Sequence, residues 1–320
     1  MNVNATRQRM RLRDVSVFFM LVLLNVISLQ SQDMTRVDAM VQFYPNTFES
    51  VAELSNRISR DFSTEEEKVR AMYGWIIHNV RYDPDEYKVF NYKFKDFRDR
   101  NAKEEIMRNK IIERTVQKGI GVCEGYAMLF EKLCEMQGIR NYLVRGDAKT
   151  NFKDIGREFQ KLHMWNVVYI DDLPYLLDAT WGAGRFNQTF IKEPSYYWFQ
   201  TDPKLFVNTH YPDLPEDTLL EKPLSKSDFA QMPLIISKQL YLENVMTPNS
   251  GLLNVPSREI QFQLQMKAPK TISYAYNFKK EKIEVPFTSE KGTVQFSVRN
   301  DIGKLIVYFD DAPALAYIVE

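Results

Sequence analysis

The chain has 320 residues, of which 44% are hydrophobic and 26% are charged. These proportions are ordinary for a globular protein, and the length allows one large domain or two smaller ones. Lys and Arg together number 42, as do Asp and Glu, so no charge excess points to nucleic acid or to an anionic membrane surface as a partner.

The N-terminus has its own composition. A segment with four arginines precedes an apolar run from Val15 to Leu29. A membrane-spanning helix needs about 20 apolar residues, so a membrane anchor is the weaker interpretation. Small and polar residues lie at the end of the run and just after it, at Ser28, Ser31 and Gln32. The pattern predicts a secretory signal peptide over residues 1–31 and hence an exported protein, either periplasmic or secreted.

Helical spacing of apolar residues follows. The first predicted helix has its apolar face at Val51, Leu54 and Ile58. A second helix begins with capping-box residues around Thr64 and Glu67 and continues as an apolar stripe to Val80. Residues 81–100 show no period and are predicted to form a long functional loop, and residues 102–116 are predicted to be helical.

A further helix is predicted to begin at Cys123, after Gly119 and Gly121. Cys134 lies on the apolar face of the same helix. At a rise of about 1.5 Å per residue the two cysteines are roughly 16 Å apart, whereas a disulfide needs Cα atoms within about 7 Å. Both are therefore predicted to be free thiols, and a free thiol in an exported protein needs a reason.

The position of Cys123 supplies such a reason. The first turn of a helix has a positive dipole end and unpaired N–H groups, which stabilise a thiolate, the nucleophilic form of cysteine. The same N–H groups can bind an oxyanion. A helix start flanked by glycine is usually exposed, so Cys123 is predicted to be an exposed nucleophile. Cys134 is predicted to be a core residue.

A cysteine nucleophile needs a base, and the chain has only three histidines. His78 lies off the apolar stripe of its helix and is predicted to be solvated. His210 lies in a loop before Pro212, and we assign it no mechanism. His163 opens an apolar strand over residues 163–170, which makes it the candidate base.

A carboxylate is available to orient His163. If Asp171 and Asp172 form a two-residue hairpin turn, the returning strand over residues 175–180 pairs Thr180 with His163. Asp178 is then a diagonal neighbour on the same face, roughly 7–8 Å away at Cα. Such a carboxylate holds the imidazole in one tautomer, so we predict a Cys123–His163–Asp178 triad.

The sequence shows no motif for metal, phosphate or nucleic-acid binding. Three scattered histidines and no Cys-x-x-Cys motif give no zinc site, and no phosphate-binding glycine loop is present. The sequence therefore predicts neither a metal nor a cofactor. Nothing resembles a basic, aromatic-interleaved surface for nucleic acid.

The C-terminal part changes character. Prolines punctuate residues 203–223, and residues 213–230 are predicted to be an extended linker. From residue 231 onward short segments alternate apolar and polar residues, which predicts a small all-β sandwich over residues 231–320. The predicted organisation is thus a signal peptide, a catalytic domain over residues 32–212, the linker and the sandwich.

Three blocks of the sequence resemble a known family. They are Gly121–Ala127, His163–Asn166 and Asp178–Gly182, with Arg81–Asp83 as an upstream entry motif. In this order they resemble the catalytic blocks of the transglutaminase-like superfamily. Residues 197–203 and the segment around His210 are similar to its kyphoscoliosis-peptidase-type branch, and the resemblance covers residues 45–235.

The resemblance implies a papain-like α+β core, in which a helix bearing the cysteine packs on an antiparallel sheet that carries the histidine and the aspartate. It implies thiol chemistry on amides and no metal. By analogy, Tyr82 or Trp75 helps to form the oxyanion hole. Trp165 and Trp181 flank the histidine and aspartate positions, where they either line the substrate site or pack at the sheet edge.

The sequence therefore predicts an exported thiol hydrolase that acts on peptide or amide bonds, with a protein or peptide substrate such as a cell-surface or cell-wall peptide. Two alternatives remain open. One is a transamidase that crosslinks proteins, which would use the same residues. The other is a non-catalytic binding module on the same scaffold.

Overall fold

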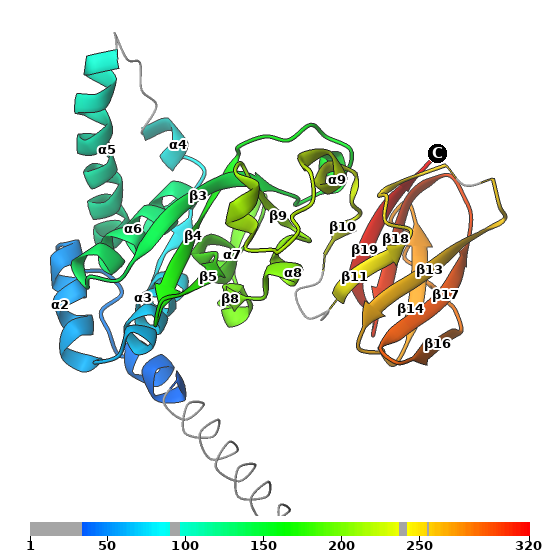
Figure 1. Cartoon of the computed structure of the whole chain (residues 1–320), viewed down its shortest axis with the longest axis horizontal. Coiled ribbons are helices and arrows are strands. Elements are labelled where there is room, and N and C mark those ends of the chain that lie inside the picture. Colours follow the sequence, from blue (N-terminus) through cyan, green and yellow to red (C-terminus); the bar gives the residue numbers. More distant parts are fainter. Residues whose placement is uncertain (1–33, 90–96, 237–241, 255) are drawn as a thin grey trace, which may run out of the picture.

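The protein is described here from a computed structural model, which describes residues 34–89, 97–236, 242–254 and 256–320. Helices lie at one end of the molecule, a five-stranded sheet lies in the middle, and a two-sheet β unit lies at the other end (Figure 1). The predicted signal peptide lies outside the described residues. Within the described residues, no helix is both long enough and apolar enough to cross a membrane.

The principal helices precede the sheet in the chain. They are α2 (Val51–Asp61), α3 (Glu65–Asn79), α4 (Glu86–Val89), α5 (Phe97–Lys118) and α6 (Cys123–Met136). At the start of α3, Thr64 accepts from the backbone N–H of Glu67, whose side chain accepts from the backbone N–H of Thr64, so the predicted capping box is confirmed. The predicted long loop instead contains the short β1 (Arg81–Tyr82), α4 and the first turn of α5.

The central sheet is antiparallel, with strand order β8-β5-β4-β3-β9. Its strands are β3 (Asn141–Ala148), β4 (His163–Ile170), β5 (Leu173–Leu177), β8 (Phe199–Thr201) and β9 (His210–Pro212). Asp171 and Asp172 have φ of 48° and 64° and join Ile170 to Leu173, which confirms the two-residue hairpin turn. Positive φ at both central residues is the mark of a type I′ turn.

The predicted pairing of His163 with Thr180 is wrong. Strand β5 ends at Leu177, because Asp178 caps the short helix α7 (Ala179–Ala183) and its Oδ1 accepts from the N–H groups of Thr180 and Trp181. The carboxylate nevertheless reaches His163 from this capping position. The helix cap therefore places Asp178 beside His163, which the diagonal strand pair was expected to do.

Helix α6 packs against β3 and β4. Tyr126, Phe130 and Leu133 are fully buried in the main core. The amide of Asn166 on β4 donates to the carbonyl of Ala127 on α6 at 3.0 Å. A buried polar bond of this kind fixes the position of the helix on the sheet, and with it the position of Cys123.

Smaller elements complete this part. They are β2 (Ile120–Gly121), η1 (Phe152–Asp154), β6 (Gly184–Asn187), β7 (Thr189–Lys192), η2 (Tyr196–Trp198), α8 (Pro203–Phe206), η3 (Pro215–Thr218) and α9 (Lys226–Gln231). Strand β2 runs parallel to β1, and β6 and β7 form a hairpin.

Residues 213–230 are folded and packed, whereas the sequence predicted an extended linker. Phe229 of α9 is buried and stacks on Tyr211 with ring centroids 5.4 Å apart. The buried ammonium of Lys149 donates to the carbonyls of Ala230 and Met232 at 3.0 and 2.6 Å. The prolines thus accompany short helices because an apolar side chain and buried hydrogen bonds anchor the segment to the sheet.

The C-terminal unit consists of two sheets. One has the order β10-β19-β18-β14-β15, with β12 also on β19, and the other has the order β11-β13-β17-β16. The strands are β10 (Leu234–Ile235), β11 (Leu242–Thr247), β12 (Leu252–Leu253), β13 (Glu259–Met266), β14 (Ile272–Tyr276), β15 (Ile283–Glu284), β16 (Phe287–Glu290), β17 (Thr293–Arg299), β18 (Gly303–Phe309) and β19 (Ala312–Val319). Their alternating apolar residues share one core, in which Phe262 and Phe296 stack at 4.6 Å. The predicted α+β core and all-β sandwich are confirmed.

The two parts of the chain touch. Ile155, next to η1, is buried with Leu234, Ile306 and Ala316 of the first sandwich sheet. The ring of Phe152 meets the ring of Phe278 edge-on at 5.6 Å. This contact is a small apolar joint between the central sheet region and the sandwich.

Candidate functional site

Cys123 is the first residue of α6, as predicted. Gly119 allows the backbone turn that leads into α6. Its φ of +61° is left-handed, and a Cβ there would lie 2.8 Å from the carbonyl oxygen of Asn79. Contrary to expectation, Cys123 is only 2% exposed. It packs with Ala127 and Met164, so this helix start is covered by neighbouring side chains.

The thiol of Cys123 faces polar groups. Its Sγ donates to Oε2 of Glu124 at 3.2 Å and lies 3.6 Å from the hydroxyl of Tyr87. Both cysteines are free. Cys134 is completely buried, as expected for a core residue.

His163 and Asp178 come together as predicted. Nε2 of the imidazole lies 2.6 Å from Oδ2 of the carboxylate. Because Nε2 is occupied, Nδ1 is the ring nitrogen left for the thiol. Cys123 is among the groups that raise the pKa of His163, after Asp178, so the thiol lies close enough to the imidazole to affect its protonation.

The structure adds His210 to this group. Its Nε2 lies 3.0 Å from the same Oδ2 of Asp178, and its Nδ1 lies 2.8 Å from the hydroxyl of Thr209. The side chain is completely buried. His210 comes 32 positions after Asp178 and reaches it only because β9 pairs with β3. The one sequence signal was its place in the family-like segment.

Asp178 therefore has a full set of donors. Its Oδ1 accepts from the N–H groups of Thr180 and Trp181 at 2.7 and 3.0 Å, and its Oδ2 faces His163 and His210. A carboxylate has about four lone-pair sites, and all four are used. Burial alone would raise the pKa of Asp178, but the charge and hydrogen bond of His163, then His210, hold it well below its usual value.

The pKa values of the two histidines shift in opposite directions. Burial works to lower the pKa of His163, but the charge and hydrogen bond of Asp178, with Cys123, raise it above its ordinary 6.5. For His210 burial prevails, with repulsion from His163, and lowers the pKa to about 4 despite Asp178. At neutral pH the arrangement therefore consists of one imidazolium, one carboxylate and one neutral imidazole.

Of the two oxyanion candidates, Trp75 is wrong. Its side chain is fully buried against Phe48, and its indole N–H already donates to the carbonyl of Pro45 at 2.8 Å. The hydroxyl of Tyr82 lies 3.2 Å from that of Tyr87, and the Tyr87 hydroxyl in turn faces the thiol. Tyr87 was missed because it falls in the stretch without periodicity.

Trp165 and Trp181 surround the histidines. Trp165 is 1% exposed and has ring centroids 5.9 Å from His163 and 5.4 Å from His210, so it packs and cannot line a substrate site. Trp181 is partly exposed and lies 6.2 Å from His163 and 4.4 Å from His210. Only Trp181 keeps the predicted role as a candidate lining residue.

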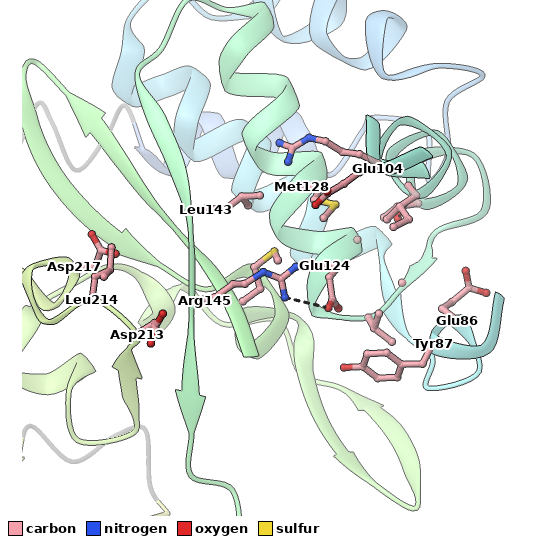
Figure 2. Close-up of a pocket in the computed structure, with 17 residues that line it drawn as sticks. Glu86, Tyr87, Glu104, Glu124, Met128, Leu143, Arg145, Asp213, Leu214 and Asp217 are labelled. Carbon is pink, nitrogen blue, oxygen red and sulfur yellow. Dashed lines mark hydrogen bonds and ion pairs between the residues drawn. The ribbon is translucent and has the colours of Figure 1, made fainter. Parts of the chain in front are cut away.

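A cavity of about 500 Å³ lies beside the start of α6. Figure 2 shows Tyr87 on one side, Asp213 and Asp217 on the opposite side, and Glu124 with Arg145 between them. Its charged lining residues are Glu86, Glu104, Glu124, Asp213, Asp217, Arg108 and Arg145. Carboxylates outnumber guanidiniums, so the cavity favours neutral or basic groups over acidic ones.

The spacing of the candidate ligands does not suit a metal ion. Within the described residues, one set of side chains places ligand atoms within 4.8 Å of one another, namely His163, Asp178 and His210. Zinc prefers its nitrogen and oxygen ligands at about 2.0–2.2 Å. The three groups instead face one another at hydrogen-bond distances of 2.6 and 3.0 Å, so an ion could enter only by replacing both bonds.

Comparison with known proteins agrees with the blocks described above. The model of the transglutaminase-like superfamily matches residues 52–203, which contain Cys123, His163 and Asp178. Residues 52–203 therefore form a transglutaminase-like domain. His210 lies beyond the matched range.

Several animal proteins are similar to this chain. Kyphoscoliosis peptidase of Mus musculus and that of Homo sapiens are each 28% identical over 236 residues, which is 72% of this chain and 33% of theirs. Hillarin of Drosophila melanogaster is 27% identical over 130 residues, or 36% of this chain and 16% of its own. The chain thus spans about a third of the length of the two peptidases. These similarities support the resemblance to the kyphoscoliosis-peptidase-type branch.

Proposed function

We propose that this protein is a thiol hydrolase of peptide or amide bonds, with Cys123 as nucleophile, His163 as base and Asp178 as the residue that orients His163. The observation that carries the proposal is the 2.6 Å bond between Nε2 of His163 and Asp178, with Cys123, at the first turn of α6, among the groups that raise the pKa of the same imidazole. Nucleophile, base and orienter in contact are the requirement for covalent catalysis.

The reaction follows from these positions. The Cys123 thiolate attacks the carbonyl carbon of the scissile amide, and the oxyanion is bound by N–H groups at the start of α6, with the Tyr87 hydroxyl as a further donor. The C–N bond breaks as the proton on Nδ1 of His163 passes to the leaving amine. Water then attacks the thioester and gives a proton to the neutral His163, and the C–S bond breaks to release the acid and restore the Cys123 thiolate beside the imidazolium.

The cavity beside α6 is the proposed place for the substrate. It adjoins Glu124 and Gly121, the neighbours of Cys123, and is open enough to expose about half of Tyr87. We infer a protein or peptide substrate, since transglutaminase-like domains act on proteins. The predicted signal peptide supports export to the periplasm or the exterior, where a cell-surface or cell-wall peptide is a suitable substrate.

A transamidase remains the second candidate, because the same thioester can be released by an amine. Hydrolysis ranks first because transfer needs a site that excludes water and admits a lysine side chain, whereas seven charged residues are among the 17 that line the cavity beside Cys123 and favour the entry of water. A pure binding module ranks below both, because binding does not require a buried thiol beside an imidazole and a carboxylate.

A competition experiment tests this ranking. A peptide mixture rich in Gln and Asn is incubated with the protein and an excess of labelled primary amine, and the acid and amine-adduct products are compared by mass. We expect acid products to predominate with the wild type and with Cys134→Ala, and no product with Cys123→Ala. A predominant amine adduct that depends on Cys123 would make the protein a transamidase.

A further inference from the structure

We propose that His210 is a positioning residue of the active site, which acts as a neutral hydrogen-bond donor that fixes Asp178 beneath His163. The inference rests on the proposed triad and adds a fourth side chain to it. Three bonds carry it: Thr209 hydroxyl to Nδ1 at 2.8 Å, Nε2 to Oδ2 of Asp178 at 3.0 Å, and the same Oδ2 to His163 at 2.6 Å.

The direction of each hydrogen bond follows from charge. Asp178 is ionised and can only accept, so Nε2 of His210 carries the proton and donates it. A second imidazolium is disfavoured, because the two histidine rings are buried with centroids 5.4 Å apart around a single carboxylate. Nδ1 of His210 is therefore bare and accepts from Thr209. Asp178 thus sets the tautomer, and the hydroxyl of Thr209 supports it by donating to the bare Nδ1 at 2.8 Å in preference to the carbonyl of Phe206 at 3.3 Å.

The surroundings hold the ring in this orientation. His210 stacks on Phe206 with centroids 4.3 Å apart and contacts Trp181 at 4.4 Å and Trp198 at 5.1 Å. The side chain has no exposed surface. An apolar side chain would fill such a cage without the cost of burying a polar ring, so the two hydrogen bonds, rather than packing, account for an imidazole here.

The hydrogen bond from His210 also restrains the orientation of the Asp178 carboxylate. Rotation about the Cβ–Cγ bond would swing Oδ2 away from His163, and because both oxygens move together, the bonds from the first turn of α7 to Oδ1 already oppose it. A second donor on Oδ2 from β9 restrains this rotation further. The strand that ends the central sheet thereby sets the angle at which His163 presents Nδ1 to Cys123.

The test compares substitutions that keep one ring nitrogen at a time. In His210→Gln the side-chain amide can replace Nε2 and donate to Asp178. In His210→Asn the shorter amide can replace only Nδ1 and reach Thr209. His210→Phe fills the cage and supplies neither bond. The measurement is the rate at which iodoacetamide alkylates Cys123 in the folded protein at pH 6, with Cys134 as internal reference and thermal unfolding as the check on folding.

We expect His210→Gln to keep the wild-type rate within about 3-fold, and His210→Asn and His210→Phe each to lose about 10-fold, since hydrogen bonds to charged groups are worth this much. Equal rates in the wild type and all three variants would overturn the positioning role and leave the triad intact. A wild-type rate no faster than that of Cys134 would overturn the triad itself. If His210→Phe fails to fold, the Gln and Asn pair decides, because equal loss in both shows that only packing matters.

Discussion

At the scale of single residues, the carboxylate of Asp178 has two tasks: it caps a helix and it binds two histidines. Its Oδ1 caps α7 while its Oδ2 binds two imidazoles. The cap fixes the carboxylate relative to the sheet without using the oxygen that faces His163. The position of the base is therefore linked directly to the point at which β5 ends.

Replacing Asp178 by Asn tests this assignment. One side of the amide is a donor, so it cannot accept from both the α7 N–H groups and the two histidines, and it stabilises the wrong tautomer of His163. We expect the rate of peptide hydrolysis to fall by roughly 10²- to 10⁴-fold. Circular dichroism should show native secondary structure. A folded variant with wild-type kcat would remove Asp178 from the mechanism.

Tyr87 gives a second prediction at this scale. Its hydroxyl faces the thiol at 3.6 Å and the Tyr82 hydroxyl at 3.2 Å, and burial, followed by the charge of Cys123, raises its pKa far above the usual range. It is therefore a neutral donor. Tyr87→Phe should lower kcat by about 10-fold with little change in KM, if the hydroxyl contacts the oxyanion only in the transition state. Tyr82→Phe is the matched control and should have the smaller effect. The reverse order would restore the role predicted for Tyr82.

Sequence reasoning succeeded at this scale where the signal was local. Cys123 was found from a glycine-flanked helix start, and Asp178 from a two-residue turn that fixes the face of the next strand. The burial of Cys123 was not foreseen, because Tyr87 and Met164 cover it from other elements. His210 was not placed either, since no local pattern reports that β9 pairs with β3.

At the scale of elements, the main surprises are where β5 stops and how residues 213–230 fold. Pairing across the turn at Asp171 and Asp172 suggested a strand through Thr180, but a capping aspartate ended the strand and started α7 instead. Prolines suggested an extended linker, yet Phe229 and Lys149 anchor the segment through contacts made with residues far away in the chain. Secondary-structure propensity describes one segment at a time, whereas the end of β5 and the fold of residues 213–230 depend on contacts with other parts of the chain.

The capping box of α3 gives a prediction about stability. Thr64 and Glu67 satisfy each other's backbone N–H groups, and α3 packs its buried face in the main core. Thr64→Ala should lower the free energy of unfolding by about 1 kcal/mol, measured by urea denaturation. Thr64→Ser keeps the hydroxyl and should cost clearly less. Equal losses in the two variants would show that the hydroxyl does not account for the effect.

At the scale of the whole molecule, buried charges link stability to pH. The pKa of His163 is raised from 6.5, so its contribution is complete below about pH 6.5 and is lost as pH rises. The pKa of Asp178 is lowered from 3.8, so its contribution is complete above that value and is lost in acid. The pKa of His210 is lowered to about 4, so stability also falls between pH 6.5 and 4, where the unfolded chain binds a proton that the folded one does not.

The directions of these three pKa shifts predict the highest Tm near pH 6.5. Because His163 and Asp178 form one pair, removing either should remove the pair's contribution. Thermal unfolding from pH 4 to 10 should therefore show a smaller alkaline loss for Asp178→Asn than for the wild type, and His210→Gln should show a smaller loss between pH 6.5 and 4. Curves that stay parallel to the wild type throughout would exclude these groups as the cause.

The sandwich provides a further prediction at the largest scale. It has its own core, and it meets the rest of the chain through the cluster of Ile155 with Leu234, Ile306 and Ala316, nearby aromatic contacts, and a buried hydrogen bond from the amide of Asn208 to the carbonyl of Leu242. A fragment of residues 231–320 should unfold cooperatively, with a β-type circular dichroism spectrum. Ile155→Ser in the full chain should separate its unfolding into two transitions. A disordered fragment would make the sandwich dependent on the central sheet.

The central claim is that Cys123 forms an acyl-enzyme with the help of His163. The most direct measurement is the pre-steady-state reaction with p-nitrophenyl acetate, followed by p-nitrophenol release and by peptide mapping of the acetyl group. The account predicts a burst of about one equivalent per chain, with acetyl on Cys123 and none on Cys134, and no burst in Cys123→Ser or His163→Ala. A wild-type protein without a burst, or one acetylated elsewhere while Cys123 stays free, would contradict it.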